Sequence, residues 1–168
     1  MLIAALLVPY MDDEKNLMDW LQWPLLVLIL VTPLRFAMEV AGIPKQITQF
    51  FSSTVFVYVL AIYLGVAMAK ETGEQLRRLL AAGFALGYVN GFMTLIATLL
   101  STYASLETHY KHHNLNMSDA QHIFMRHVIL TPLYTSVAAC VVIVLVYFIF
   151  EKVRTSRKRS IESPEDLS

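Results

Sequence analysis

The chain has 168 residues, of which 57% are hydrophobic and 15% charged, and its 13 basic and 13 acidic side chains cancel to a formal net charge of zero. This balance argues against the basic footprint of a nucleic-acid-binding protein, so we expect no nucleic acid among its partners. Since most residues belong to long apolar stretches, a separate soluble domain has no room.

The first ten residues are apolar but have neither a basic n-region nor a small-residue cleavage site, so they do not match a signal peptide. Met11 would serve as a start as well as Met1. We expect residues 1–19 to form a short cytoplasmic segment before the first helix.

Four apolar stretches follow, each long enough to cross a hydrocarbon core, which needs roughly 20 helical residues. Three of them contain no Asp, Glu, Lys or Arg over 50–69, 79–106 and 128–150. We predict an all-α polytopic membrane protein. Its four-transmembrane-helix bundle occupies residues 20–150, with helices at about 20–41, 50–69, 76–113 and 119–151 and an extracytoplasmic helical hairpin between helices three and four.

The first stretch reaches membrane length only by including Arg35 and Glu39. Residues four apart share a helix face, so the two can pair, and charges at membrane depth are costly enough to need such a partner. We favour a structural pair or interface anchor. The alternative is a partner- or ligand-binding site.

The third stretch carries small and polar residues on one arc, if successive residues lie about 100° apart. Close backbone approach drives helix association in membranes, so this arc predicts a helix-packing face. Its members are Gly83, Gly87, Gly91, Asn90 and Thr94. Three surfaces could match it: the second helix (Ala61, Gly65, Ala69), the fourth helix (Thr131, Thr135, Ala138) or a second copy of the chain. We favour packing within one chain. We also expect the Asn90 side chain to make an interhelical hydrogen bond.

The fourth stretch is preceded by a polar segment in which Ser118 and Gln121 match a capping box, predicting a helix start there, and Pro132 is expected to bend the helix. Histidines cluster around this hairpin and could bind Zn²⁺ or Cu²⁺ if it brings them together. The candidates are His109, His112, His122 and His127. We favour solvated loop histidines, because His122 points away from the small face of its helix, and no cofactor is predicted.

Haem is disfavoured, since its axial ligands would have to lie inside the spans, where no histidine occurs.

Basic residues set the orientation in the membrane: nine fall on the side of the termini and four on the other. We therefore expect both termini to be cytoplasmic in a bacterial inner or plasma membrane. Residues 152–168, basic and then acidic, are expected to be a disordered tail.

No catalytic motif is present, so we lean against an enzyme, with an intramembrane enzyme as a third alternative. The leading hypothesis is a non-catalytic accessory, assembly or scaffold subunit of a larger membrane complex, surrounded by lipid and bound to another membrane protein or a second copy. The alternative is a small ligand- or metal-handling protein, such as an oligomeric transporter, that uses Arg35, Glu39 and the histidine hairpin.

Overall fold

The computed structural model describes residues 17–69, 76–110, 118, 121 and 123–162, and over these ranges the chain forms helices and turns without a strand. The all-α prediction is confirmed for this part of the chain. The elements are α2 (Leu17–Val40), α3 (Lys45–Thr48), the 3-10 helix η1 (Gln49–Phe51), α4 (Ser53–Met68), α5 (Leu76–Tyr103), the π-helix η2 (Ile123–Leu130) and α7 (Thr131–Glu162).

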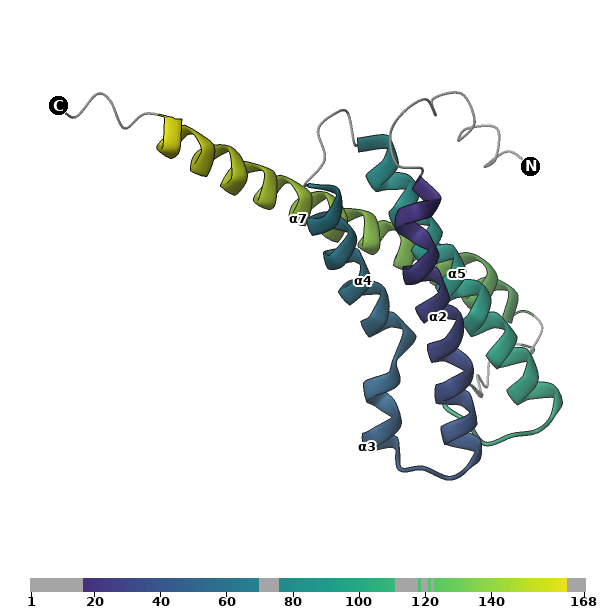
Figure 1. The fold of residues 1–168 in the computed structure, drawn as a ribbon. Helices are drawn as coiled ribbons and strands as arrows, with labels where there is room; N and C mark the ends of the chain where they lie inside the picture. The colour runs from purple at the N-terminus through teal and green to yellow at the C-terminus, as the bar shows by residue number, and fades with distance from the viewer. Residues whose placement is uncertain (1–16, 70–75, 111–117, 119–120, 122, 163–168) are drawn as a thin grey trace.

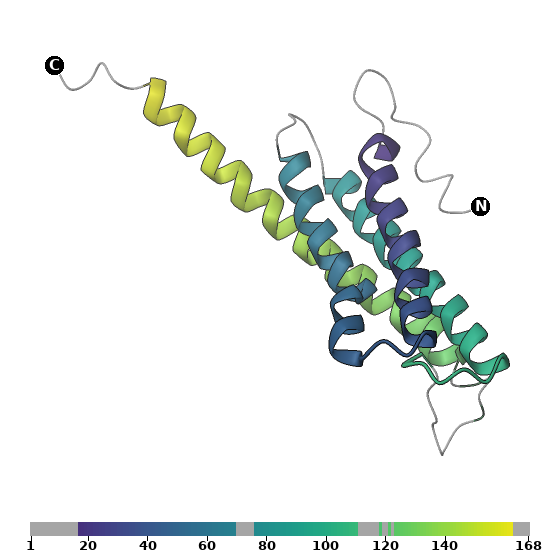
Figure 2. The same ribbon diagram turned by 60° about the horizontal axis from the view of Figure 1, so that its bottom comes forward.

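Four helical segments are long and apolar enough to cross a membrane. They are Leu17–Val40, Lys45–Met68, Leu76–Tyr103 and Ile123–Arg157. Helices α2 and α5 run in one direction and α4 and α7 in the other, so α2 begins and α7 ends on the same side of the bundle (Figures 1 and 2).

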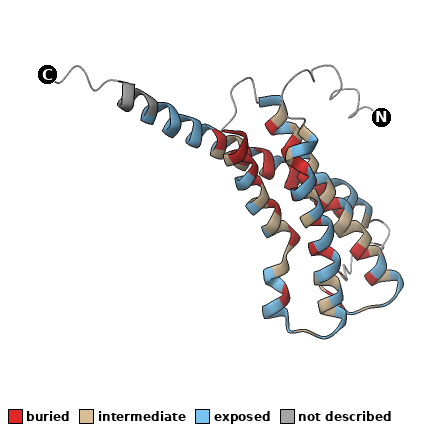
Figure 3. Cartoon of the chain, in the orientation of Figure 1, coloured by how far each residue is buried: buried red, intermediate tan, exposed pale blue. Residues whose placement is uncertain are grey.

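Helix α5 packs most extensively against α7 and α2 and also contacts α4, whereas α2 and α7 do not contact each other over the described ranges. Helix α7 crosses the others at an angle and continues beyond them (Figure 1). Buried residues gather where α4, α5 and α7 meet, and the last described side chains of α7, 151–157, are exposed (Figure 3). The largest fully buried apolar side chains are Leu28, Leu64, Met68, Leu79, Leu86 and Ile143.

The connection from α2 to α4 is a turn followed by short helical pieces, where the sequence indicated a helix from residue 50. Gly42 takes φ +77°, a left-handed conformation that suits glycine after a helix end, and Pro44 then precedes α3. Ser52 is extended (φ −67°, ψ 119°) and separates η1 from α4. The long helix therefore starts at Ser53.

Helix α5 ends at Tyr103, so the expected helix over 76–113 is too long. Ser105 adopts φ +53°, and the amide of Leu106 donates to the carbonyl of Ser101 at 2.9 Å. A left-handed residue followed by this six-to-one bond is a Schellman motif, which ends a helix. Residues 106–110 are not helical, and the rest of the expected hairpin, 111–117, lies outside the described residues.

The last helix starts with a π-helical stretch and ends later than expected. Ser118 and Gln121 exchange bonds of 3.3 Å, which confirms the capping box. Pro132 offers no amide to the preceding turn, and the hydroxyl of Thr131 donates to the Arg126 carbonyl at 2.7 Å; both favour a widened helix here.

The tail predicted to be disordered from residue 152 is helical through Glu162. Two features support this extension. Its lysines and arginines are good helix formers, and Arg154 Nη1 donates to the Ala69 carbonyl of the α4 end at 3.3 Å.

Candidate functional site

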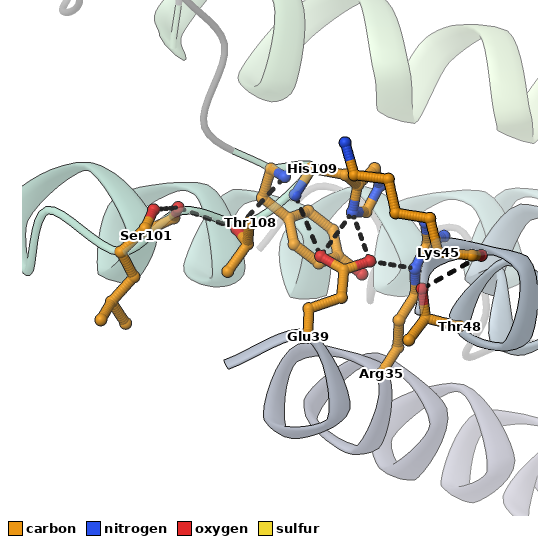
Figure 4. Close-up of polar contacts among 9 residues, drawn as sticks. Arg35, Glu39, Lys45, Thr48, Ser101, Thr108 and His109 are labelled. Carbon is orange, nitrogen blue, oxygen red and sulfur yellow. Dashed lines mark hydrogen bonds and ion pairs between the residues drawn. The ribbon is translucent and has the colours of Figure 1, made fainter. Parts of the chain in front are cut away.

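A buried carboxylate, Glu39, is the centre of a polar cluster near the end of α2 (Figure 4). One of its oxygens lies 3.0 Å from Arg35 Nε, one turn earlier on the same helix. The other accepts the backbone N–H of His109 at 3.0 Å, and His109 Nδ1 lies 3.1 Å from both oxygens. Three N–H groups therefore face a carboxylate whose side chain is only 6% exposed.

The turn that ends α5 brings His109 onto α2. Ser101 Oγ donates to the Leu106 carbonyl at 2.9 Å and lies 2.8 Å from Thr108 Oγ1, which in turn accepts the amide of Tyr110 at 3.3 Å. These bonds fold the segment 104–110 back across the bundle end. The cluster thus joins residues 70 positions apart in the chain.

The buried ring of Tyr110 packs against the cluster. Its centroid lies 3.9 Å from that of His109 and 6.2 Å from that of Phe36, and the guanidinium carbon of Arg35 lies 5.7 Å from the Tyr110 ring centroid. Burial raises the pKa of Tyr110 to about 12, so the phenol is neutral at physiological pH. Its hydroxyl has no hydrogen-bond partner within the described ranges.

His109 is held as a neutral imidazole. Burial is the main cause that lowers its pKa below the ordinary 6.5, and the nearby positive charge of Arg35 adds to it. In a neutral ring facing a carboxylate, Nδ1 carries the proton and donates, which leaves Nε2 with its lone pair. This tautomer is assigned from the hydrogen-bond network. The His109 side chain is 36% exposed.

A carboxylate that orients a histidine is also the arrangement behind many metal-binding imidazoles. The described residues, however, contain no group of three or more His, Cys, Asp or Glu that could hold an ion. His112 and His122 lie outside the described residues, and His127 is buried on the π-helix η2. A Zn²⁺ or Cu²⁺ site involving the hairpin stays a prediction.

The three predicted packing glycines of α5 face α7. A Cβ built on Gly83 would lie 2.5 Å from Cys140 Sγ and 2.7 Å from its backbone nitrogen, and one on Gly87 or Gly91 would overlap Ser136 or Pro132. Helix α7 therefore approaches through Pro132, Ser136 and Cys140. Of the three partner surfaces considered, the described structure places the fourth helix here.

Hydrogen bonds across this close contact run from α7 hydroxyls to α5 carbonyls. Thr135 Oγ1 donates to the Gly87 carbonyl at 3.2 Å, and Ser136 Oγ donates to the Phe84 carbonyl at 3.4 Å. The predicted Thr135 is thus at the interface. Gly65 of α4 also touches α7, because an added Cβ would lie 2.8 Å from the Ile143 carbonyl.

Asn90 lies on the same arc and is 1% exposed, but the expected interhelical hydrogen bond of its amide is wrong. Neither Oδ1 nor Nδ2 has a hydrogen-bond partner in the described part of the chain. Its backbone carbonyl accepts the Thr94 hydroxyl at 2.8 Å, so Thr94 bonds within its own helix. The Asn90 amide is thus a buried polar group that the described residues leave without a hydrogen bond.

Tyr110 and Thr108 belong to the cluster but were not found from the sequence. Both follow a turn that has Ser at the left-handed position, where glycine would be the usual signal. Sequence spacing predicted the Arg35–Glu39 pair, but it gave no reason to connect Glu39 with His109.

Comparison with known proteins adds no relative: no family model, curated protein or solved structure matches this chain.

Proposed function

We propose that this chain is an integral membrane protein and acts as a non-catalytic accessory, assembly or scaffold subunit of a larger membrane complex. The observation that carries the proposal is the use of its polar groups. The one carboxylate described at the α2 end is bonded by Arg35 of the same helix and by two N–H groups of His109, which tie the segment after α5 to α2, so it holds the fold together instead of facing a substrate.

The outward surface supports insertion in lipid. Large apolar side chains are exposed on all four long helices, among them Trp23 (67%), Tyr63 (53%), Phe92 (61%) and Leu145 (57%). Soluble monomers rarely expose contiguous apolar surface of this extent, whereas lipid-facing helices do. We place both ends of the chain on the cytoplasmic side, following the distribution of basic residues.

The test is purification of the tagged full-length chain from its native membrane in mild detergent, followed by native mass measurement. A scaffold subunit travels at fixed stoichiometry with a second membrane protein. A chain that is recovered alone under every growth condition contradicts the proposal.

A second candidate function, small-ligand or metal handling, is favoured by one specific feature, the Nε2 lone pair of a partly exposed His109. Metal analysis of the purified protein, with His109→Ala and His122→Ala as comparison variants, tests this reading. Metal content that both substitutions leave unchanged argues against it.

A further inference from the structure

Arg35 has donors that the cluster does not use. Its Nε is directed to Glu39, while neither Nη1 nor Nη2 donates to a residue in the described ranges, and neither is enclosed as a buried unpaired atom. The guanidinium is therefore held at Nε, and its two terminal amino groups have no partner within the described ranges, on a side chain that is 12% exposed. A fixed guanidinium is a good oxyanion ligand, because its orientation needs little further ordering.

Two further nitrogen groups lie at the same place. The side chain of Lys45, at the start of α3, extends toward His109 (Figure 4). Lys45 is exposed and has no ion pair among the described residues, and its charge is felt at the His109 ring. The second ring nitrogen of His109, Nε2, points away from the Glu39 carboxylate.

The charged side chains at this site have a net charge of plus one. Arg35 and Glu39 cancel each other, and Lys45 adds the remaining positive charge. The Glu39 oxygens are occupied by N–H groups and only 6% of the side chain is exposed, so the carboxylate is shielded from an approaching anion. An anion there meets a guanidinium and an ammonium, and beside them an imidazole whose Nε2 can donate once the ring is protonated.

We propose that Arg35, Lys45 and His109 form a binding site for a phosphate-type oxyanion, either the phosphate of an anionic lipid headgroup or free inorganic phosphate. A guanidinium edge can bind two phosphate oxygens at once, and the ammonium supplies a further charge. An anion beside the ring also favours the imidazolium, in which Nε2 becomes a donor.

The surroundings suit a headgroup. Ile47 and Phe50, which follow Lys45, are 49% and 73% exposed, so apolar side chains flank the basic group as they do where a protein meets the headgroup and acyl layers. The lipid form of the proposal depends on the membrane placement proposed above but not on the scaffold role. Binding of free phosphate depends on neither.

The experiment uses full-length protein labelled with ¹⁵N-histidine in an uncharged detergent, with the His109 signal identified by its loss in His109→Gln. Inorganic phosphate is titrated in one arm, and phosphatidylglycerol, against phosphatidylcholine, in the other. We expect saturable shifts of the His109 ring signals with phosphatidylglycerol and none with phosphatidylcholine. Equal shifts with inorganic phosphate show that the free anion suffices.

Two variants test the residues. Lys45→Gln changes an exposed side chain and should weaken the affinity about fivefold. Arg35→Lys keeps a positive charge beside Glu39 but removes the guanidinium with its two terminal amino groups. This variant should weaken the affinity for phosphate about tenfold. The matched control is Arg77→Gln, an exposed basic residue at the opposite end of the bundle, which should leave the affinity unchanged.

The outcomes separate clearly. Loss of affinity in Lys45→Gln and Arg35→Lys but not in Arg77→Gln supports the site. No saturable shift with either probe, affinity unchanged in both site variants, or the same loss in Arg77→Gln overturns it. None of these results decides whether the chain has a protein partner, so the failure of this site and that of the scaffold proposal are distinguishable.

Discussion

Replacing Glu39 by Gln perturbs the cluster with the smallest change of shape. The substitution removes the charge and one of two acceptor oxygens, so an amide NH₂ must face one of the N–H groups of Arg35 or His109. A hydrogen bond to a charged group contributes about 1.5–3 kcal/mol, and removing one partner of a buried ion pair costs about 3–5 kcal/mol. Because the His109 side chain is 36% exposed, solvent screening lowers the expected loss to about 2–3 kcal/mol in the free energy of unfolding.

The assay is equilibrium unfolding of the purified protein in mixed detergent–SDS micelles, with Glu151→Gln, an exposed glutamate on α7, as the matched control. A cycle of Glu39→Gln, His109→Gln and the double variant isolates the contact between α2 and the segment after α5. We expect a coupling of about 1–2 kcal/mol. A loss in Glu39→Gln below about 0.5 kcal/mol, or equal to that of Glu151→Gln, would refute the stabilising role.

Four other predictions concern single positions. Gly87→Leu should cost about 3 kcal/mol or more and reduce the yield of monodisperse protein in size-exclusion chromatography, because its side chain overlaps the Ser136 backbone; a normal yield contradicts the contact. Asn90→Leu should be neutral or stabilising by about 1 kcal/mol in the same unfolding assay, whereas a loss above about 2 kcal/mol would reveal a partner of the amide. Ser105→Gly should stabilise by about 0.5–1 kcal/mol, since it relieves a side chain at φ +53°, and a decrease in stability would argue against this turn. Below pH 6.5 the unfolded His109 binds more protons than the folded one, so stability should fall as the pH drops from 7.5 to 5, and this slope should be smaller in His109→Gln; an unchanged slope contradicts the assignment.

The helices were predictable because apolar length and composition are local properties of the sequence. So was the Arg35–Glu39 pair, since residues four apart on a helix must be neighbours. The glycine spacing predicted a close contact but not its partner, because the chain offers similar small-residue spacing on two other helices. The structure was needed to place Pro132, Ser136 and Cys140 opposite the glycines of α5.

The contact between His109 and Glu39 was not predicted, because it depends on the turn that reverses the chain after α5. The end of α5 has no glycine or proline, so nothing local distinguishes Tyr103 from the residues that follow, and the apolar pattern was extended too far. The error placed His109 on a helix face, when the Schellman turn instead carries it to Glu39. Contacts between residues this far apart follow from tertiary packing and leave no periodic signal.

The central claim, that the four long helices cross a membrane, is tested most directly by labelling single cysteines with a membrane-impermeant maleimide in intact cells. With Cys140 replaced by Ser, one variant carries Ser105→Cys after α5 and the other Ser156→Cys near the end of α7, two exposed positions at opposite ends of the bundle (Figure 2). We predict that Ser105→Cys is labelled in intact cells and Ser156→Cys only after permeabilisation. Labelling of both from the same side, or release of the protein from membranes by alkaline carbonate, would contradict the account.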